Sequence, residues 1–177
     1  MFKVGDNIVY PMHGAGTIES IEDKNILGEN KKYYVMKMPG EVKVMVPTTN
    51  AESIGVRDII PNVESNKVFE VLAQETVDTS LNWNKRYRDN MDKMKSGDVY
   101  AVADVVRSLS FKQKEKGLST GEKKMLVNAK QILISELALS SDMQESAVEE
   151  QINEKIDVSY SEYNGSGDSA TGATEEF

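Results

Sequence analysis

The chain has 177 residues, of which 39% are hydrophobic and 28% charged, proportions typical of a globular protein with one large domain or two small ones. It has no cysteine and one histidine, which excludes disulfides, thiolate chemistry, iron–sulfur clusters and zinc sites built on cysteine or several histidines. No apolar run is long enough for a membrane helix, and Asp6 interrupts the first residues before the apolar core of a signal peptide develops. We therefore expect a cytoplasmic protein without a membrane segment.

The net charge of -8 is distributed unevenly along the chain. Residues 1–64 carry 7 basic and 9 acidic side chains, residues 65–139 carry 13 and 10, and residues 140–177 carry 1 and 10. Exposed charges more than about 10 Å apart are largely screened at physiological salt, so the local sign decides which surface can approach a polyanion. The basic middle segment is therefore the candidate surface for nucleic acid.

Residues 1–62 have the pattern of a small all-β domain. Short segments with a period close to two predict strands at 7–10, 14–21, 31–38, 41–46 and 55–59. Tyr33 and Val35 are expected on one face together with alternating valines, and Lys43 and Met45 on the other. Because such short strands cannot leave both faces in water, we expect the five strands to close into a barrel.

Residues 63–157 have the longer period of helices and predict an all-α domain. We expect a first helix capped by Asn66, then helices over 82–95, 98–116 and 119–139, and a weaker acidic helix over 141–157. Gly97 followed by Asp98 is typical of one helix ending and the next being capped. Ser119 and Glu122 have the spacing of a capping box.

Residues 158–177 contain four acidic residues, three glycines and no basic residue, a composition that buries too little apolar area to offset chain entropy. We expect a disordered acidic tail there. The predicted fold class is thus α+β in two domains, a five-stranded barrel followed by about five helices.

The sequence does not predict a catalytic site. His13 has no cysteine or second histidine to act with, so we interpret it as a turn residue at the edge of the barrel. The run Gly14-Ala15-Gly16-Thr17-Ile18-Glu19 lacks the third glycine of a dinucleotide fingerprint and leads into a strand. Most carboxylates fall on helical faces or in the tail. We therefore expect no enzyme activity, no metal and no cofactor.

The most informative segment is Leu81-Asn82-Trp83-Asn84-Lys85-Arg86-Tyr87-Arg88, which places the only tryptophan at the start of a helix with three basic residues in the next five positions. A flat apolar ring beside phosphate-binding cations can insert at a base step from the minor groove. At 100° per residue, however, Trp83 also lies close to the stripe of Tyr87 and Met94, so it can equally be a core residue. The spacing alone leaves both interpretations open.

The helix that begins at Trp83 carries five cations. Lys85, Arg88 and Lys95 are expected on one side, and Arg86 and Lys93 on the adjoining one. The helix N-terminus adds a dipole that favours anions. Lys123, Lys124 and Lys130 are further basic positions of the same segment, although lysines on a helix are more often a solvated face than a DNA surface.

Many short motifs of residues 2–139 together resemble the CarD/CdnL family of bacterial transcription regulators. They are Phe2-Lys3-Val4-Gly5-Asp6, Val9-Tyr10-Pro11, His13-Gly14, Val46-Pro47, Asn50-Ala51, Gly55-Val56-Arg57-Asp58, Lys67-Val68-Phe69, Asn82-Trp83, Arg86-Tyr87, Ser96-Gly97-Asp98-Val99, Gly117-Leu118-Ser119, Gly121-Glu122-Lys123, Gln131-Ile132-Leu133 and Glu136-Leu137-Ala138-Leu139. The acidic extension beyond residue 140 departs from this resemblance.

The resemblance implies a Tudor-like N-terminal domain, shared with transcription-repair coupling factor, that binds the β subunit of RNA polymerase. It also implies a helical domain that contacts promoter DNA at the upstream edge of the transcription bubble. In the family, the tryptophan at the position of Trp83 is a minor-groove wedge, and the basic positions of Lys85, Arg86 and Arg88 flank it on the DNA backbone. The resemblance therefore favours the wedge interpretation of Trp83 over the core interpretation.

For the β-subunit contact the resemblance implies exposed strand surface with basic residues nearby. Lys24 matches one such position, and the strand segment around Val46 and Pro47 provides the surface. Where relatives often carry an arginine before the Val-Pro pair, this chain has Met45, which weakens a salt-dependent part of the contact or shifts it to Lys43.

From the sequence we therefore expect a monomeric transcription regulator with domains at 1–62 and 63–157 and a tail at 158–177. It would bind the polymerase β subunit, stabilise the open promoter complex and associate with the nucleoid through polymerase. The alternative is an adaptor on RNA polymerase whose helical domain binds another protein and never contacts DNA.

Overall fold

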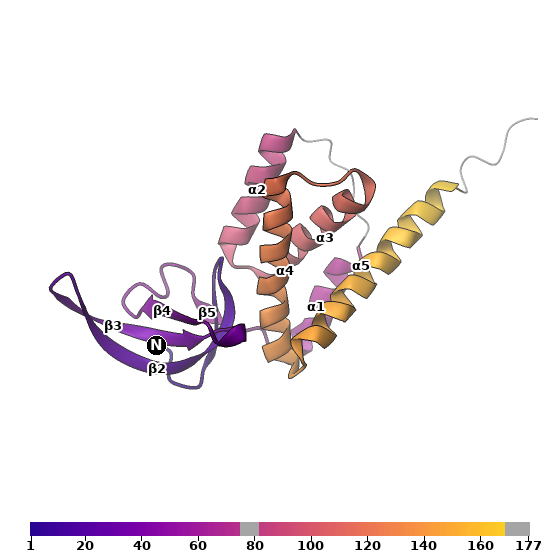
Figure 1. The fold of residues 1–177 in the computed structure, drawn as a ribbon. Coiled ribbons are helices and arrows are strands. Elements are labelled where there is room, and N and C mark those ends of the chain that lie inside the picture. The colour runs from indigo at the N-terminus through magenta and orange to yellow at the C-terminus, as the bar shows by residue number, and fades with distance from the viewer. Residues whose placement is uncertain (75–81, 169–177) are drawn as a thin grey trace, which may run out of the picture.

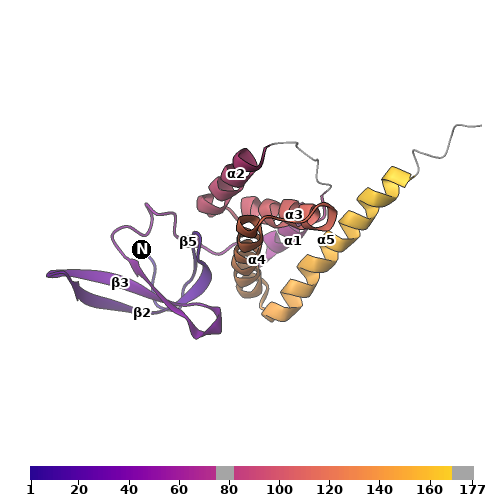
Figure 2. The same ribbon diagram turned by 45° about the horizontal axis from the view of Figure 1, so that its top comes forward.

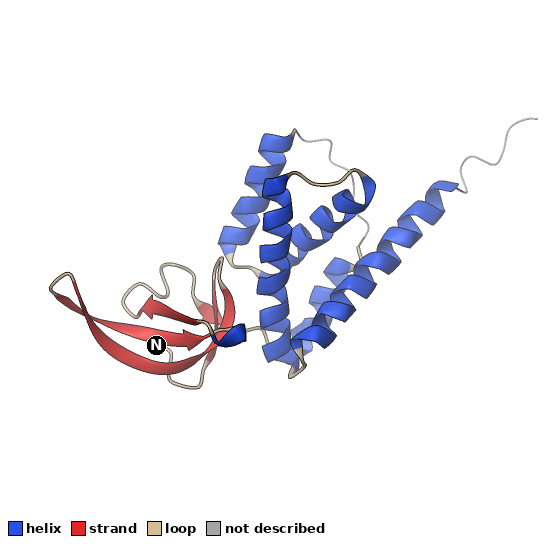
Figure 3. Cartoon of the chain, in the orientation of Figure 1, coloured by secondary structure: helices blue, strands red, loops and turns tan. Residues whose placement is uncertain are grey.

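The structure is a computed structural model that describes residues 1–74 and 82–168, with side chains of the second range as far as residue 165. A five-stranded antiparallel sheet is followed by five helices, an arrangement consistent with two domains (Figures 1 and 3). The strands are β1 (Asn7–Tyr10), β2 (Gly14–Ile26), β3 (Glu29–Lys37), β4 (Lys43–Pro47) and β5 (Arg57–Asp58). The helices are α1 (Asn62–Leu72), α2 (Trp83–Ser96), α3 (Val99–Glu115), α4 (Thr120–Ser141) and α5 (Glu145–Asp168).

The strand order is β4-β3-β2-β1-β5, which places β4 and β5 at the two edges of the sheet. The expected five strands are confirmed, whereas closure into a barrel stays a prediction. Strands β2 and β3 are longer than expected and form a ribbon that projects away from the helices (Figure 1). Leu27 and Gly28 join them with φ of 55° and 82°, and two positive φ values give the turn that matches strand twist. The pairing therefore continues through exposed residues that show no alternation of hydrophobicity.

The core of the sheet shows that the expected face of β3 was wrong. Tyr34 and Met36 are buried there, opposite Val46 and Val44 of β4 in the strand register. The bulge between Ile18 and Ser20 of β2 shifts the register beside β3. Lys43 and Met45 point outward, as expected, because they alternate with the two valines.

The predicted ends of the middle helices are confirmed by their caps. The Asn82 side chain accepts a hydrogen bond from the backbone N–H of Lys85, and the Asp98 side chain accepts one from that of Tyr100. Gly97 ends α2 in the left-handed conformation, and Ser119 forms the expected capping box at the start of α4. The prediction of Asn66 as a cap was wrong: α1 already begins at Asn62.

The prediction of a disordered tail from residue 158 was also wrong as far as residue 168, because α5 continues to Asp168. Tyr160 and Tyr163 lie three residues apart, and their rings contact Phe111 at centroid distances of 5.4 Å and 6.2 Å. Ser159 is buried, and its hydroxyl donates to the Gln74 carbonyl at 3.1 Å. These contacts stabilise a segment whose average composition predicted disorder. The rest of the predicted tail, residues 169–177, lies outside the described residues.

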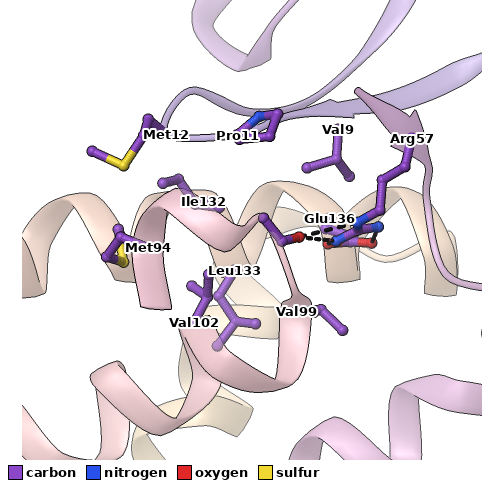
Figure 4. A pocket seen from close by; sticks show the side chains of 11 residues that line it. Val9, Pro11, Met12, Arg57, Met94, Val99, Val102, Ile132, Leu133 and Glu136 are labelled. Atoms are coloured by element: carbon purple, nitrogen blue, oxygen red, sulfur yellow. Dashed lines mark hydrogen bonds and ion pairs between the residues drawn. The ribbon is translucent and has the colours of Figure 1, made fainter. Parts of the chain in front are cut away.

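The two domains meet where α4 faces β2 and β5 (Figure 2). The Arg57 guanidinium donates to both carboxylate oxygens of Glu136, at 2.7 Å and 3.0 Å, and also to the Gly97 carbonyl (Figure 4). The Ala15 backbone N–H donates to the Ser135 hydroxyl at 2.9 Å. A Cβ at Gly14 would lie 2.8 Å from that hydroxyl, so the chains approach closely here. The interface holds the helical domain in a defined orientation on the sheet.

Candidate nucleic-acid interface

Trp83 is the first residue of α2, and its side chain is 45% exposed. One face of the indole stacks on Tyr87, one turn further along the helix, with ring centroids 5.2 Å apart and an interplanar angle of 19°. Of the two interpretations left open by spacing, the structure thus contradicts a fully enclosed core residue. An aromatic pair supports the ring from behind while part of its surface remains in solvent.

The indole is also tethered to a second helix. Its Nε1–H donates to the hydroxyl of Ser119, the N-cap residue of α4, at 3.0 Å. Helices α2 and α4 therefore begin side by side at the same end of the helical domain (Figure 1). Helix N-termini carry partial positive charge and favour anions, so two of them converge beside the ring.

A buried carboxylate lies directly beneath this tether. Glu122 is 1% exposed, and its Oε1 accepts from Arg86 Nε at 2.8 Å. Its Oε2 accepts from the Ser119 backbone N–H at 3.2 Å and lies 3.5 Å from Lys112 Nζ. Burial raises the pKa of Glu122, but the hydrogen bonds from Arg86 and Ser119 and the charges of Arg86 and Lys112 outweigh it and hold the pKa below its usual range. Glu122 is therefore ionised at neutral pH.

Of the eight residues expected to contact DNA, the structure brings five to the same end of the domain. Trp83, Lys85 and Arg88 lie in the first two turns of α2, and Lys123 and Lys124 lie in the first two turns of α4, all exposed.

The other three cations are held in contacts within the domain. Arg86 pairs with Glu122 of α4, Lys93 pairs with Asp104 of α3, and Lys130 donates to the Asn153 side chain of α5 at 3.1 Å. Sequence reasoning missed these partners because each lies on a different helix.

A groove between α2 and α4 continues from the aromatic pair. It has a volume of about 270 Å³, and its lining includes Tyr87, Met91, Lys124 and Met125. Gly121 leaves room for the Tyr87 ring, which approaches to 3.4 Å from the position of an added Cβ. The close approach of the two helices here fixes the ring that supports Trp83.

The residues expected to bind polymerase lie on the sheet. On edge strand β4, Lys43 and Met45 are exposed, Pro47 is half-buried and Val46 is fully buried, so the Val46 side chain belongs to the core. Lys43 forms an ion pair with Glu19 at 3.0 Å, which raises the pKa of its ammonium group above its usual value. Lys24 lies on the projecting ribbon, where it pairs with Glu22 at 3.2 Å. The two predicted basic positions therefore lie on different strands.

Two further searches covered only the described residues. Across residues 1–74 and 82–168, the structure contains no cluster of three or more histidine, aspartate or glutamate side chains arranged to hold a metal ion. In the same ranges, none of the helices has the length and apolar composition needed to cross a membrane.

Comparison with known proteins identifies the class to which this fold and site belong. Residues 2–60 match the family model of the CarD-like/TRCF RID domain, and residues 67–153 match that of the CarD C-terminal domain. A two-domain chain with these matches is a transcription regulator.

A Bacillus subtilis (strain 168) protein, YdeB, described as a candidate transcription factor, is 42% identical to this chain over 149 residues. The match covers 84% of this chain and 97% of the relative. The chain belongs to the CarD family, and the resemblance that its sequence motifs indicated is confirmed.

Proposed function

We propose that this protein binds the β subunit of RNA polymerase through its sheet and stabilises the open promoter complex by inserting Trp83 at the upstream edge of the bubble. It would act as a monomer, without enzyme activity or cofactor, and reach the nucleoid through polymerase. The observation that carries the proposal is the exposed indole, supported from behind and tethered where two helix N-termini meet.

The polymerase contact is supported by the match of residues 2–60 to a domain shared with transcription-repair coupling factor. Edge strand β4 offers backbone groups for pairing with a strand of the partner, and such pairing carries much of the affinity of a strand-addition contact. The outward-pointing Lys43 and Met45 would set its specificity, while Val46 contributes through its backbone alone.

The DNA contact would be weak without polymerase. The whole chain carries a net charge of -8, and three of the expected cations are held in internal contacts. With few phosphates neutralised, binding to free DNA at physiological salt is poor. Binding to polymerase raises the effective concentration of Trp83 at the promoter, which makes a weak wedge sufficient.

The test is the lifetime of open complexes formed with Trp83→Ala. Stacking of a base on an aromatic ring contributes about 1 to 3 kcal/mol, so the stabilisation that the protein confers should fall about fivefold to a hundredfold. Val127→Ala, at an exposed position further along α4, is the matched control and should leave the lifetime unchanged. Polymerase binding and folding should be unaffected in both variants. An unchanged lifetime with Trp83→Ala would contradict the wedge.

The second candidate is an adaptor that binds polymerase and another protein without contacting DNA. The internal pairing of Arg86, Lys93 and Lys130 favours it, because it removes cations from the surface. A photoreactive group at residue 85, in place of the lysine, separates the two. Crosslinks to the upstream bubble edge are expected from a DNA contact, whereas crosslinks to protein alone would indicate the adaptor.

A further inference from the structure

The orientation of the Trp83 ring depends on more than its own helix. As the first residue of α2, Trp83 has a helical neighbour one turn later, Tyr87, but no preceding turn to pack against. The Tyr87 ring covers one face of the indole, and the Ser119 hydroxyl fixes the in-plane direction of its N–H. The direction of the indole therefore depends on where the Ser119 hydroxyl points.

The Ser119 hydroxyl takes part in three hydrogen bonds. It accepts from Trp83 Nε1–H at 3.0 Å and from the Glu122 backbone N–H at 3.2 Å. Its own proton is donated to Glu122 Oε2, also at 3.2 Å. A hydroxyl has one proton and two lone pairs, so this arrangement uses all three. The carboxylate fixes the proton and thereby leaves a lone pair directed at the indole.

Glu122 also fixes the helix that carries the tryptophan. Arg86 is one turn after Trp83 in α2, and its Nε donates to Glu122 Oε1. Helix α2 is therefore attached to the start of α4 at two points, through Trp83 and through Arg86. A buried ion pair adds little net stability compared with apolar side chains of the same volume, so stability alone does not account for it.

We propose that Glu122 is a positioning residue: through Ser119 and Arg86 it holds the Trp83 indole in the orientation that enters DNA. This inference rests on the proposed function. Glu122 itself is buried and would not touch DNA. Arg86, expected from the sequence to contact the DNA backbone, would instead act from within the domain.

The first experiment needs only the free protein. Trp83 is the sole tryptophan, so its fluorescence anisotropy and its quenching by acrylamide report this ring directly. Glu122→Gln keeps the size of the side chain but replaces one acceptor oxygen by a donor. We expect faster local motion of the indole and about two- to tenfold greater quenching, the range that the loss of one hydrogen bond produces.

Glu136→Gln is the matched control, because Glu136 is equally buried and is also paired with an arginine. It lies 14 residues further along α4, about 21 Å at 1.5 Å per residue. This variant should lower stability and leave the Trp83 signal unchanged. An equal change of the signal in both variants would overturn the proposal, because the effect would then be general loosening.

Ser119 provides a second route if Glu122→Gln does not fold. Ser119→Ala removes the acceptor of the indole N–H and should change the Trp83 signal in the same direction, while Ser119→Thr keeps the hydroxyl and should restore it. An unchanged signal in Ser119→Ala would overturn the proposal.

The second experiment tests function with a double-mutant cycle on open-complex lifetime. If Glu122 acts through Trp83, Glu122→Gln shortens the lifetime in the wild-type background and has no further effect in Trp83→Ala. The same fold-change in both backgrounds would overturn the positioning role. A lifetime unaffected by Trp83→Ala itself would contradict the proposed function, whereas the fluorescence result would still decide whether Glu122 orients the ring.

Discussion

The Arg57–Glu136 pair joins the two domains, and its burial determines the cost of breaking it. The Glu136 side chain is 2% exposed and that of Arg57 31%. Arg57→Ala removes two donors and leaves the Ile60 backbone N–H, at 3.0 Å, as the donor described for this carboxylate. The negative charge is then buried without its counter-charge.

Removing one partner of a buried ion pair costs about 3 to 5 kcal/mol, and water reaching the space left by Arg57 places this case at about 3 kcal/mol. For a chain of this length, 1 kcal/mol corresponds to about 2 to 4 °C in Tm, so the variant should melt about 6 to 12 °C lower. Urea unfolding followed by circular dichroism measures the free energy directly.

Two further variants test the reasoning. Adding Glu136→Gln to Arg57→Ala removes the uncompensated charge and should recover part of the lost stability. Lys31→Ala breaks an exposed pair with Glu29 and should leave the unfolding midpoint unchanged. A midpoint for Arg57→Ala equal to that of the wild type would refute the view that this pair fixes the domains.

Three other perturbations have expected outcomes. Gly97→Ala should lower the free energy of unfolding by about 1 to 3 kcal/mol in urea, because φ at this position is 71° and the added Cβ would lie 2.9 Å from the Pro11 ring. The lowered pKa of Glu122 contributes stability that is complete above its unfolded value of about 4.3 and is lost as pH falls through the folded value, so the stability difference between wild type and Glu122→Gln should shrink below pH 4 in acid unfolding. Replacing Lys123 and Lys124 by alanine should flatten the salt dependence of binding to the polymerase–promoter complex by about one logarithmic unit per phosphate contact, and an unchanged slope would place both lysines away from DNA.

The sequence predicted those parts of the fold that depend on neighbouring residues. The caps at Asn82, Asp98 and Ser119 are local hydrogen bonds within three positions, and all three are present. The face of β3 could not be predicted in this way, because the bulge in β2 sets which side chains of β3 face the core. The end of α5 depends on the contact of Tyr160 with Phe111 of α3, which composition does not contain.

The same distinction applies to the candidate site. The indole, the helix start and the exposed cations can be read from the segment around Trp83. Helical spacing could not decide whether the ring is buried, because that depends on the position of α4 beside α2. Nor could it predict that Arg86 turns to Glu122, 36 residues away. The S-x-x-E spacing indicated a cap, but a buried role for its glutamate follows only from packing.

The most direct test of the proposed function is the environment of the indole in the assembled complex. The single tryptophan can be replaced by 5-hydroxytryptophan, which is excited at longer wavelengths than the tryptophans of polymerase. Adding polymerase alone should leave the emission of this residue nearly unchanged, and adding forked promoter DNA should then shift and quench it as the ring stacks on a base. Emission that responds to polymerase but not to promoter DNA would contradict the wedge.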